Sequence, residues 1–438
     1  MLSNSVLISV AIMITLSLLR LNVLLALIIA ALAGGLLAGM PLEDTMKIFI
    51  GGLGKNTETA LNYILLGALA AAIQKTGAAK IITQSLSKSM KGTGKLLIFI
   101  IAIISIFSQN LIPVHIAFIP ILIPPLIPIM NKLNIDRRAV ASALTFGLKA
   151  PYIVIPAGYG LIFHTTIRNE MATSGLVLNN MEIWQVMWIP GLAMVVGLLV
   201  AVLITYGKPR AYQNARQDDI GPEISDENEQ KILFNKDHAF AVIGAVAALI
   251  VQLTFGSLVL GALLGLTIMV VSGAIKWSDI DDMLKSGINM MGFIAFVMLV
   301  ASGYGDVIRA TGGIDTLVES VVGIIGTNQL IAATCMIVLG LLITLGIGTS
   351  FGTIPIIAAI YVPLATELGF STMAIVLLIG SAAALGDAGS PASDSTLGPT
   401  AGLNIDQQHD HIWDTCVPTF LHYNIPIMIF GIVGAMIL

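Results

Sequence analysis

The stretch Gly386-Asp387-Ala388-Gly389-Ser390-Pro391-Ala392-Ser393-Asp394-Ser395-Thr396 directly follows the long apolar run 371–385. That run has the character of a membrane helix. Backbone that leaves a helix inside a bilayer has unpaired N–H and C=O groups, so it is tolerated only where it lines an enclosed or watery site. Carboxylates at that depth are costly and are functional candidates by default. The stretch therefore predicts a binding site inside a broken membrane helix.

The composition of the whole chain agrees with this setting. The chain has 438 residues, of which 56% are hydrophobic and 11% charged, with a mean hydropathy of +0.94. A soluble domain has about 25% charged residues. We therefore predict an all-α polytopic protein embedded in a lipid bilayer. Cys335 and Cys416 lie in or beside membrane segments, so we expect no disulfide framework.

The apolar runs divide into single spans and longer stretches. The single candidate spans are 5–20, 22–40, 58–78, 137–165, 184–206, 237–255, 257–275, 292–311, 372–398 and 419–437. Two further runs, 96–131 and 329–366, are too long for one span. Each is interrupted near its middle, at 108–115 and at 346–352. Each therefore predicts a helical hairpin, either re-entrant or fully crossing.

The two halves of the chain are related by a shift of 235 residues. The matching pairs are Asp44 with Asp279, Thr76-Gly77 with Thr311-Gly312, Pro120 with Pro355, Pro128 with Pro363, Leu133 with Leu368, and Pro156-Ala157 with Pro391-Ala392. Internal repeats of this kind are typical of secondary transporters. We predict a first repeat at 1–206, a solvated linker at 207–236 and a second repeat at 237–438. Each repeat should contain five transmembrane helices, one of them broken, and one hairpin.

An odd number of crossings in each repeat predicts that the second repeat is inverted. The loop after the third span carries four basic residues between 80 and 95, whereas the equivalent loop, 315–330, has no Lys or Arg. Basic residues collect on the cytoplasmic side of a membrane. We therefore expect the linker to lie in the cytoplasm and both termini to lie outside the cytoplasmic membrane.

The two broken helices carry different chemistry. In the shared register, Asp387 matches Tyr152 and Asp394 matches Tyr159. Lys149 is the only base at comparable depth in the first half. It either pairs with Asp387 or Asp394, to be displaced when a cation binds, or lines a wet cavity unpaired. The sequence leaves both readings open.

The acids and nearby hydroxyls predict a cation site. Asp387 and Asp394 could bind Na⁺, carry protons or hold a substrate ammonium. Neutral oxygens suited to a dehydrated Na⁺ come from Ser390, Ser393, Ser395, Thr396, Thr349 and Ser350. Any single hydroxyl could instead bond its own helix. Asn110 and His115 lie at the first hairpin break, where His115 suits substrate or proton binding as well as a structural role.

Several function classes lack their motifs. No G-x-x-x-x-G-K-[ST] phosphate loop occurs, so direct ATP drive is unsupported. We find no Ser–His–Asp arrangement and no His-Glu-x-x-His pattern, so we expect no enzyme, no organic cofactor and no nucleic-acid partner. The segment 409–414 contains histidines and aspartates, but its spacing matches no usual zinc pattern, and a gate or cap is the better interpretation. Inequivalent halves favour a gated carrier over an open channel.

The motif Gly386-Asp387-x-x-Ser390-Pro391-x-Ser393-Asp394-Ser395-Thr396 resembles the signature of NhaC-type Na⁺/H⁺ antiporters of the ion transporter superfamily. The tail from Gly402-Leu403-Asn404 through His409-Asp410-His411-Ile412-Trp413-Asp414-Thr415 is similar to a subgroup that includes proteins thought to carry amino acids such as histidine. The likeness spans nearly the whole chain. It implies an inverted-repeat fold with two hairpins and two broken helices. A homodimer is common in this superfamily.

We therefore expect a secondary active transporter that couples Na⁺ or H⁺ to a small solute. The aromatics Tyr152 and Tyr159, with Asn110 and His115, make a cavity more elaborate than a bare ion requires, which favours an amino acid as cargo. The alternative is a Na⁺/H⁺ antiporter without an organic substrate.

Overall fold

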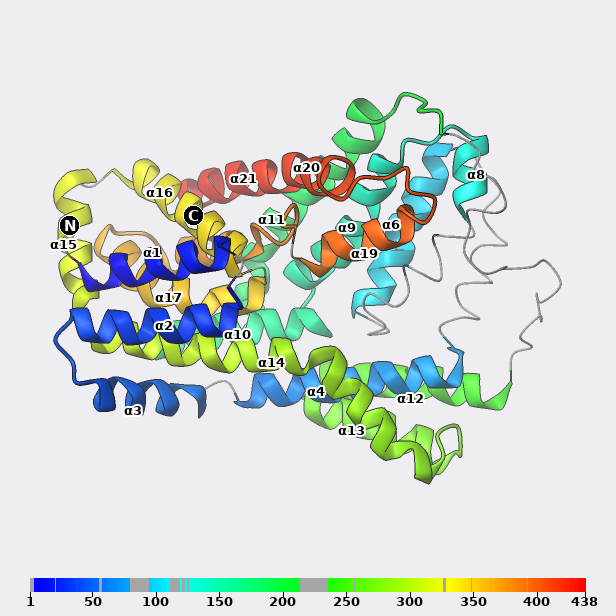
Figure 1. Cartoon of the computed structure of the whole chain (residues 1–438), viewed down its shortest axis with the longest axis horizontal. Helices are drawn as coiled ribbons and strands as arrows, with labels where there is room; N and C mark the ends of the chain where they lie inside the picture. The colour runs from blue at the N-terminus through cyan, green and yellow to red at the C-terminus, as the bar shows by residue number, and fades with distance from the viewer. Residues whose placement is uncertain are drawn as a thin grey trace.

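The computed structural model describes residues 4–19, 21–54, 57–78, 94–110, 119, 123, 126–212, 235–255, 257–325, 328–347, 349–391 and 393–438. Within these ranges all regular secondary structure is helical, as predicted (Figure 1). The first half contains α1 (Ser5–Leu18), α2 (Val23–Leu37), α3 (Leu42–Leu53), α4 (Thr57–Thr76), α6 (Gly94–Asn110), α8 (Ile127–Lys132), α9 (Arg137–Val154), α10 (Tyr159–Thr173), α11 (Asn180–Val200) and η4 (Ala201–Thr205). The second half contains α12 (Lys236–Phe255), α13 (Leu258–Val271), η6 (Trp277–Asp279), α14 (Ile280–Ala310), α15 (Gly313–Ile325), α16 (Gln329–Ile347), α17 (Ser350–Glu367), α18 (Thr372–Ala384), α19 (Asp394–Leu403), η7 (His411–Cys416), α20 (Val417–Thr419), η8 (Phe420–Asn424) and α21 (Ile425–Ile437).

Several of these helices can cross a membrane by length and composition. Four continuous stretches in the described part meet both criteria: Asn180–Thr205, Met291–Ala310, Ser350–Glu367 and His411–Ile437. The bent pair α9 and α10 makes a fifth if it is one span. Other apolar helices, such as α1, α2 and α13, have 14 or 15 residues and are shorter than a full span. The number of spans in each half stays a prediction.

Two helices have no counterpart among the expected spans, and one is longer than expected. The amphipathic helix α3 carries Glu43, Asp44 and Lys47, which lower its local hydropathy, and α15 was likewise not expected. Helix α14 begins at Ile280 and runs for 31 residues, whereas the apolar pattern predicted a span only from 292. A hydropathy pattern locates the part of a helix inside the hydrocarbon and does not register its polar extension.

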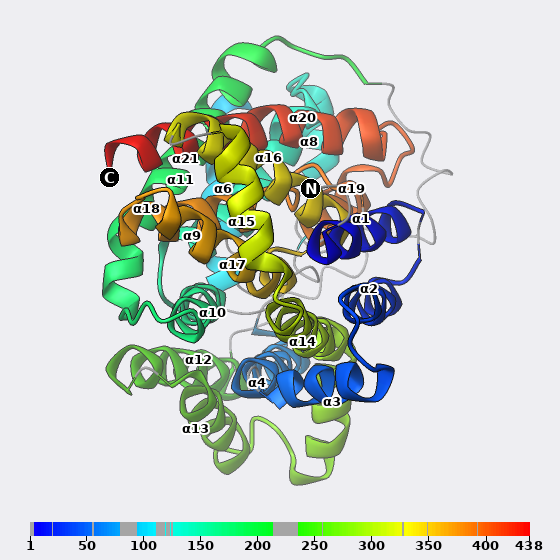
Figure 2. The same ribbon diagram turned by 90° about the vertical axis from the view of Figure 1, so that its left-hand side faces the viewer.

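Helix α14 packs along α3 and α4, and glycines allow the backbones to approach closely (Figure 2). A Cβ on Gly52 of α3 would lie 2.8 Å from the Gly303 Cα of α14. A Cβ on Gly287 of α14 would lie 2.4 Å from the Ala68 N of α4. Small residues at such crossings are typical of membrane helices, because apolar packing in lipid depends on close van der Waals contact.

Turns that lie 235 residues apart share their geometry. The Thr76 hydroxyl donates to the Ile73 carbonyl at 2.7 Å, and the Thr311 hydroxyl donates to the Ile308 carbonyl at the same distance. The glycine that follows each threonine has a positive φ, +79° at residue 77 and +65° at residue 312. The turns after α8 and α17 also match, with left-handed residues at 134 and 369.

Helix α17 lies at the centre of the molecule and brings the broken helices together (Figure 2). It is the most buried of the four long spans, since 83% of its residues are buried inside the protein. It packs against α10, α14 and α18, while α19 packs against α9. The two helix breaks and the start of α17 therefore meet in the protein interior.

Candidate functional site

The first break lies between α18 and α19. Gly386 and Gly389 have φ values of +81° and +95°, in the left-handed region that favours glycine. Gly386 also has no room for a side chain, because a Cβ there would lie 2.7 Å from the Leu345 N of α16. The Ser393 hydroxyl accepts a hydrogen bond from the Ser395 N–H and so caps α19. Glycines end one helix and a serine starts the next.

The second break lies between α9 and α10, whose axes differ by 46°. Pro151 lies in the last turn of α9, and Gly158, with φ of +58°, precedes α10. The Nε2 atom of His164 lies 2.8 Å from the Ile153 carbonyl, in hydrogen-bonding distance. His164 therefore supplies a partner for a backbone group that the break removes from the helix.

Asp387 lies at the meeting point of three elements. Its side chain is 7% exposed and forms an ion pair through Oδ2 with Lys149 of α9, whose side chain is 6% exposed. Lys149 also donates to the Tyr152 hydroxyl at 3.1 Å. The Tyr152 hydroxyl donates to the same Asp387 oxygen at 2.9 Å. Of the alternatives that the sequence left open for Lys149, the structure shows the pair with Asp387.

The start of α17 also points at Asp387. Both the hydroxyl and the backbone N–H of Ser350 donate to Asp387 Oδ2, the N–H at 3.3 Å. Ser350 is the first residue of α17, where free N–H groups and the helix dipole favour a negative charge. A lysine, a tyrosine and a helix N-terminus thus stabilise the ionised form of this carboxylate.

The hydroxyls after Asp387 divide between the carboxylate and the backbone. Ser393 donates to Asp387 Oδ1 at 3.3 Å and lies 2.9 Å from the Ser395 hydroxyl. Ser395 itself donates to the Asp387 carbonyl at 2.8 Å. Thr396 donates to the Ser390 and Ser393 carbonyls. Ser393 thus donates to the side chain of Asp387, whereas Ser395 and Thr396 donate to backbone carbonyls.

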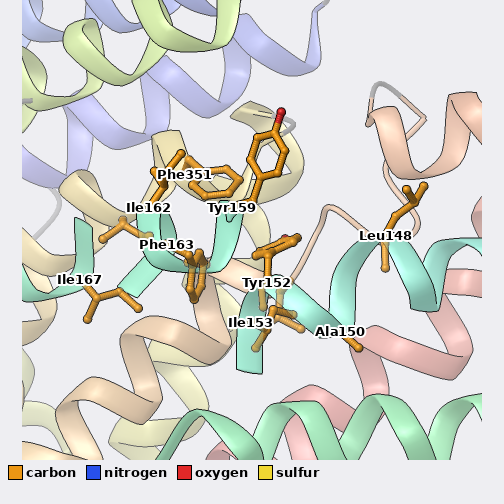
Figure 3. Close-up of a cluster of buried hydrophobic side chains, with 14 of the residues drawn as sticks. Leu148, Ala150, Tyr152, Ile153, Tyr159, Ile162, Phe163, Ile167 and Phe351 are labelled. Carbon is orange, nitrogen blue, oxygen red and sulfur yellow. The ribbon is translucent and has the colours of Figure 1, made fainter. Parts of the chain in front are cut away.

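Aromatic rings cover one side of the charged pair. The Tyr152 ring centroid lies 5.3 Å from that of Phe351 and 5.4 Å from that of Phe163 (Figure 3). Tyr159 adds a ring 6.5 Å from Phe351 and donates its hydroxyl to the Met291 sulfur. Rings packed at these distances exclude water and strengthen the nearby electrostatic interactions. The sequence predicts the two tyrosines at this site but gives no signal for the two phenylalanines.

Some predicted site groups lie outside the described residues. These are His115 and the side chains of Asn110 and Asp394, although α6 ends at Asn110 and α19 begins at Asp394. Thr349 occupies the N-cap position of α17 and makes no side-chain cap bond there. The roles of these four residues stay predictions.

A second buried ion pair lies at the start of α9. Arg137 and Asp406 face each other through two contacts of 2.6 and 2.5 Å, and their side chains are 0% and 2% exposed. Arg137 also donates to the Leu403 carbonyl and to Asn131. The Arg137 guanidinium lies over the Tyr212 ring, 4.3 Å from its centroid. Burial opposes ionisation of Asp406, but the bonds from Arg137 outweigh it and hold the Asp406 pKa below its ordinary value.

A third ionic group lies near the other end of the broken helix. Arg309 of α14 contacts Glu170 of α10 at 2.7 Å and Asp306 at 2.9 Å. Glu170 is 3% exposed, whereas the side chains of Arg309 and Asp306 are partly exposed, at 21% and 12%. The sequence gives no indication that Glu170 and Arg309 form a pair. Charges spread over distant segments give no local sequence signal.

The segment 409–414 includes the start of the π-helical turn η7, with Asp410 at its N-cap position. Asp410 accepts from the N–H groups of Ile412 and Trp413 at the start of η7, and His409 lies 2.7 Å from the Thr415 hydroxyl. Burial lowers the pKa of His409 to about 4, so it is neutral at physiological pH. Within the described ranges, no group of three or more His, Cys, Asp and Glu residues is arranged to hold a metal ion.

Two sequence profiles and several relatives place the chain in the same protein family. The profile described as "Na+/H+ antiporter family" matches residues 143–434, and one described as "Na+-H+ antiporter family" matches residues 4–90. An uncharacterised membrane protein of Vibrio parahaemolyticus is 48% identical, over 99% of this chain and all of its own length. A Bacillus subtilis protein, YuiF, named provisionally as an amino acid transporter, is 49% identical over 99% of this chain and all of its own length. Together with the apolar helices, these relatives identify a multi-pass membrane protein.

Two solved transporters share the fold. The YdaH transporter of Alcanivorax borkumensis superposes with a TM-score of 0.60 at 12% identity, covering 90% of this chain and 88% of that one. MtrF of Neisseria gonorrhoeae, from a class of antimetabolite efflux pumps, gives 0.57 at 15% identity, covering 91% and 84%. At these identities the likeness concerns the fold alone. Both neighbours are transporters and not enzymes.

Proposed function

The chain belongs to the Na⁺/H⁺ antiporter family and is a cation-coupled transporter; we propose that its cargo is a small amino acid and that Asp387 binds the coupling cation. The resemblance to NhaC-type antiporters is thereby confirmed. The observation that carries the proposal is the buried pair of Lys149 and Asp387. A buried charge pair between two helix breaks is a site where an external cation can replace an internal one.

The two oxygens of Asp387 suggest how such an exchange proceeds. Oδ2 forms the ion pair with Lys149 and accepts hydrogen bonds from Tyr152 and from both donors of Ser350. Oδ1 accepts a hydrogen bond from Ser393 at 3.3 Å. Na⁺ prefers oxygen ligands, and a carboxylate oxygen with adjacent hydroxyls offers them. We propose that Na⁺ or a proton binds Asp387 and releases Lys149. Asp394 stays a predicted second ligand, and no organic cofactor is part of the proposal.

Alternating access requires two parts that move against each other, and we propose that they derive from inverted repeats. Adding 235 to residue 52 gives 287, and subtracting 235 from residue 303 gives 68. The close contact of Gly52 with Gly303 therefore has a repeat-related counterpart in the contact of Gly287 with Ala68. Tyr152 and Asp387 are themselves 235 residues apart and share a hydrogen bond. Repeat-related residues touch each other only near a two-fold axis. The proposed repeats are 1–206 and 237–438, joined by the linker 207–236.

The proposed orientation follows from charge. We propose that the protein lies in the cytoplasmic membrane, with the linker in the cytoplasm and both termini outside, because of the positive-inside rule. Labelling from outside of a cysteine placed between residues 80 and 95 would contradict this orientation. A homodimer is proposed from the family resemblance alone.

An amino acid cargo has three supports. YuiF, a relative over almost the whole chain, is provisionally named an amino acid transporter. The aromatic rings around Tyr152 form a surface that a bare ion does not need. A helix N-terminus and a carboxylate lie together, as recognition of a zwitterion requires. The second candidate is Na⁺/H⁺ antiport without organic cargo, which the family description favours.

Flux into proteoliposomes tests the proposal and separates the candidates. We expect uptake of at least one labelled amino acid, driven by an inward Na⁺ or proton gradient. Asp387→Asn should abolish this uptake. Asp282→Asn is the matched control, because the side chain of Asp282 is 75% exposed and pairs with the equally exposed Lys285 at the surface. If Na⁺ dissipates a pH gradient but no amino acid enters, the antiporter alternative is correct.

A further inference from the structure

Asn424 is a buried amide that the site above does not use. It is the last residue of the π-helical turn η8 and is 0% exposed. Neither its Oδ1 nor its Nδ2 has a hydrogen-bond partner among the described residues. Native proteins rarely leave a buried polar group unpaired, and a group that is unpaired on both atoms calls for an explanation. π-helical turns are themselves frequent at functional sites.

The residues around Asn424 show which way it faces. Gly431 lies two helical turns further along the same face of the helix. A Cβ built on Gly431 would lie 3.0 Å from the Ser381 side chain of α18 and 3.4 Å from Ile337 of α16. Phe420, one turn before Asn424, lies against Gly389. A Cβ built on Gly389 would lie 2.6 Å from the Phe420 Cβ. Asn424 thus lies between two residues that contact α18 and the break after it.

The level of Asn424 along the helices coincides with the break. Helix α21 runs antiparallel to α18, because Leu377 meets Gly434 while Ser381 meets Gly431. Two turns beyond Ile337, α16 reaches Thr344, whose backbone lies 2.9 Å from a Cβ built on Gly386. Two turns back from Gly431, the last span reaches Asn424. Asn424 therefore lies at the level of Gly386, next to Asp387 in the chain.

The fold itself does not need an amide at this position. In the proposed repeat register Asn424 corresponds to Ile189, whose side chain packs near Gly434. An aliphatic residue therefore suits the equivalent position in the first half. The polar substitution occurs in the same half as the acids of the central break.

We propose that the Asn424 carboxamide binds the zwitterionic head of the transported amino acid. Its Oδ1 would accept a hydrogen bond from the ammonium group, and its Nδ2 would donate one to the carboxylate. An amino acid presents both groups side by side and so satisfies both atoms, whereas Na⁺ would satisfy Oδ1 alone. The inference rests on the proposed function.

Thermal unfolding of the purified full-length protein tests this assignment. The parent and Asn424→Leu are compared in NaCl and in choline chloride, with each of the twenty standard amino acids added singly to the NaCl sample. We expect Asn424→Leu without amino acid to unfold at the parent temperature or above, because an unpaired amide is removed. Its Na⁺ response should remain, while binding of the stabilising amino acid should weaken by about tenfold or more, because bonds to charged groups are lost.

Gln252→Leu is the matched control. Gln252 lies on α12, which packs on α13 and α4, and its Nε2 also has no partner among the described residues. This variant should keep both the Na⁺ and the amino acid responses. Asn424→Gln retains both polar atoms but displaces them, so it should fold like the parent and bind the amino acid more weakly.

The outcomes separate this inference from the proposed function. An undiminished amino acid response in Asn424→Leu, or loss of only its Na⁺ response, would overturn the role of Asn424 while the amino acid cargo stands. Earlier unfolding of both Asn424 variants with the amino acid response intact would show a structural amide. If no amino acid stabilises the parent, the proposed cargo is wrong and the assignment of Asn424 fails with it.

Discussion

Two buried ion pairs start from the same helix and are built differently. Arg137 and Asp406 use two nitrogens and two oxygens, and the same two Arg137 nitrogens also donate to Leu403 and Asn131. Lys149, about 18 Å further along α9 at 1.5 Å per residue, contacts Oδ2 of Asp387 through its one ammonium nitrogen. A guanidinium fork fixes its partner in one geometry, whereas an ammonium is a point charge that another cation can replace.

We propose that the two pairs have separate roles. The arginine pair ties the start of α9 to the loop after α19 and to Tyr212, and it holds these segments together. The lysine pair lies between two helix breaks and beside hydroxyls that can serve a cation. An ion pair whose cation must be replaced by another cation should have no net charge. Its geometry should not be fixed by several directional hydrogen bonds.

The largest expected difference comes from removing each carboxylate. Asp387→Asn should abolish stabilisation by Na⁺ and reduce coupled transport to the rate of empty liposomes, because the charged ligand is lost. Asp406→Asn should instead lower the unfolding temperature and leave the Na⁺ response of the folded protein intact. Thermal unfolding with and without NaCl measures both. A normal Na⁺ response in Asp387→Asn would remove Asp387 from the cation site.

Removal of the arginine should affect stability. Arg137→Met should destabilise the protein by about 3–5 kcal/mol, because it leaves the Asp406 charge buried without its partner. Chemical unfolding in detergent measures this change. Arg168→Met is the control, since Arg168 has hydrogen bonds to the adjacent Asn169. Equal stability of the two variants would contradict the proposed tie.

Removal of the lysine should change ion affinity more than folding. In Lys149→Met the internal competitor for Asp387 is absent, so the apparent Na⁺ affinity should rise about ten- to hundredfold, as expected when one buried cation no longer has to be displaced. Lys285→Met, at an exposed position, should leave it unchanged. Unaltered Na⁺ affinity in Lys149→Met would show that the ammonium does not compete with the cation.

The smallest expected effect concerns pH. Burial lowers the pKa of folded His409 to about 4, below its ordinary value of about 6.5. As the pH falls below 6.5, the unfolded chain therefore binds a proton that the folded chain does not. His409 should thus reduce stability by about 1 kcal/mol at pH 5.5 relative to pH 7. His409→Gln should flatten this part of the stability profile; an identical acid slope in both proteins would contradict the assignment.

The central site was largely predictable, because its elements have local signals. Glycines, a proline and acids within one apolar run predicted the break at Asp387, and the repeat register placed Tyr152 opposite it. The structure brings these two side chains into hydrogen-bond contact and places Lys149 and Ser350, two further candidates from the sequence, at the same carboxylate. Asn424 did have a weak signal, as a polar residue matched to an isoleucine in the repeat, but was not identified from it.

Contacts between distant segments were not predictable. Arg137 and Asp406 are 269 residues apart, and Glu170 and Arg309 are 139 apart. A single charge near the end of an apolar run has the same local pattern whether it is solvated or paired in the interior. The phenylalanines around Tyr152 gave no signal either, since nearly every segment of this chain is apolar.

The sequence by itself determined that this chain is helical and membrane-embedded, and that its polar chemistry lies at helix breaks. Those properties follow from hydropathy, glycine, proline and charge, which act over one or two helical turns. Only the tertiary structure decided which charges pair, because pairing depends on which helices the fold brings together. Lys149 could have paired with Asp387 or Asp394 or lined a wet cavity, and the approach of α9 and α17 to the break places it beside Asp387 in the protein interior.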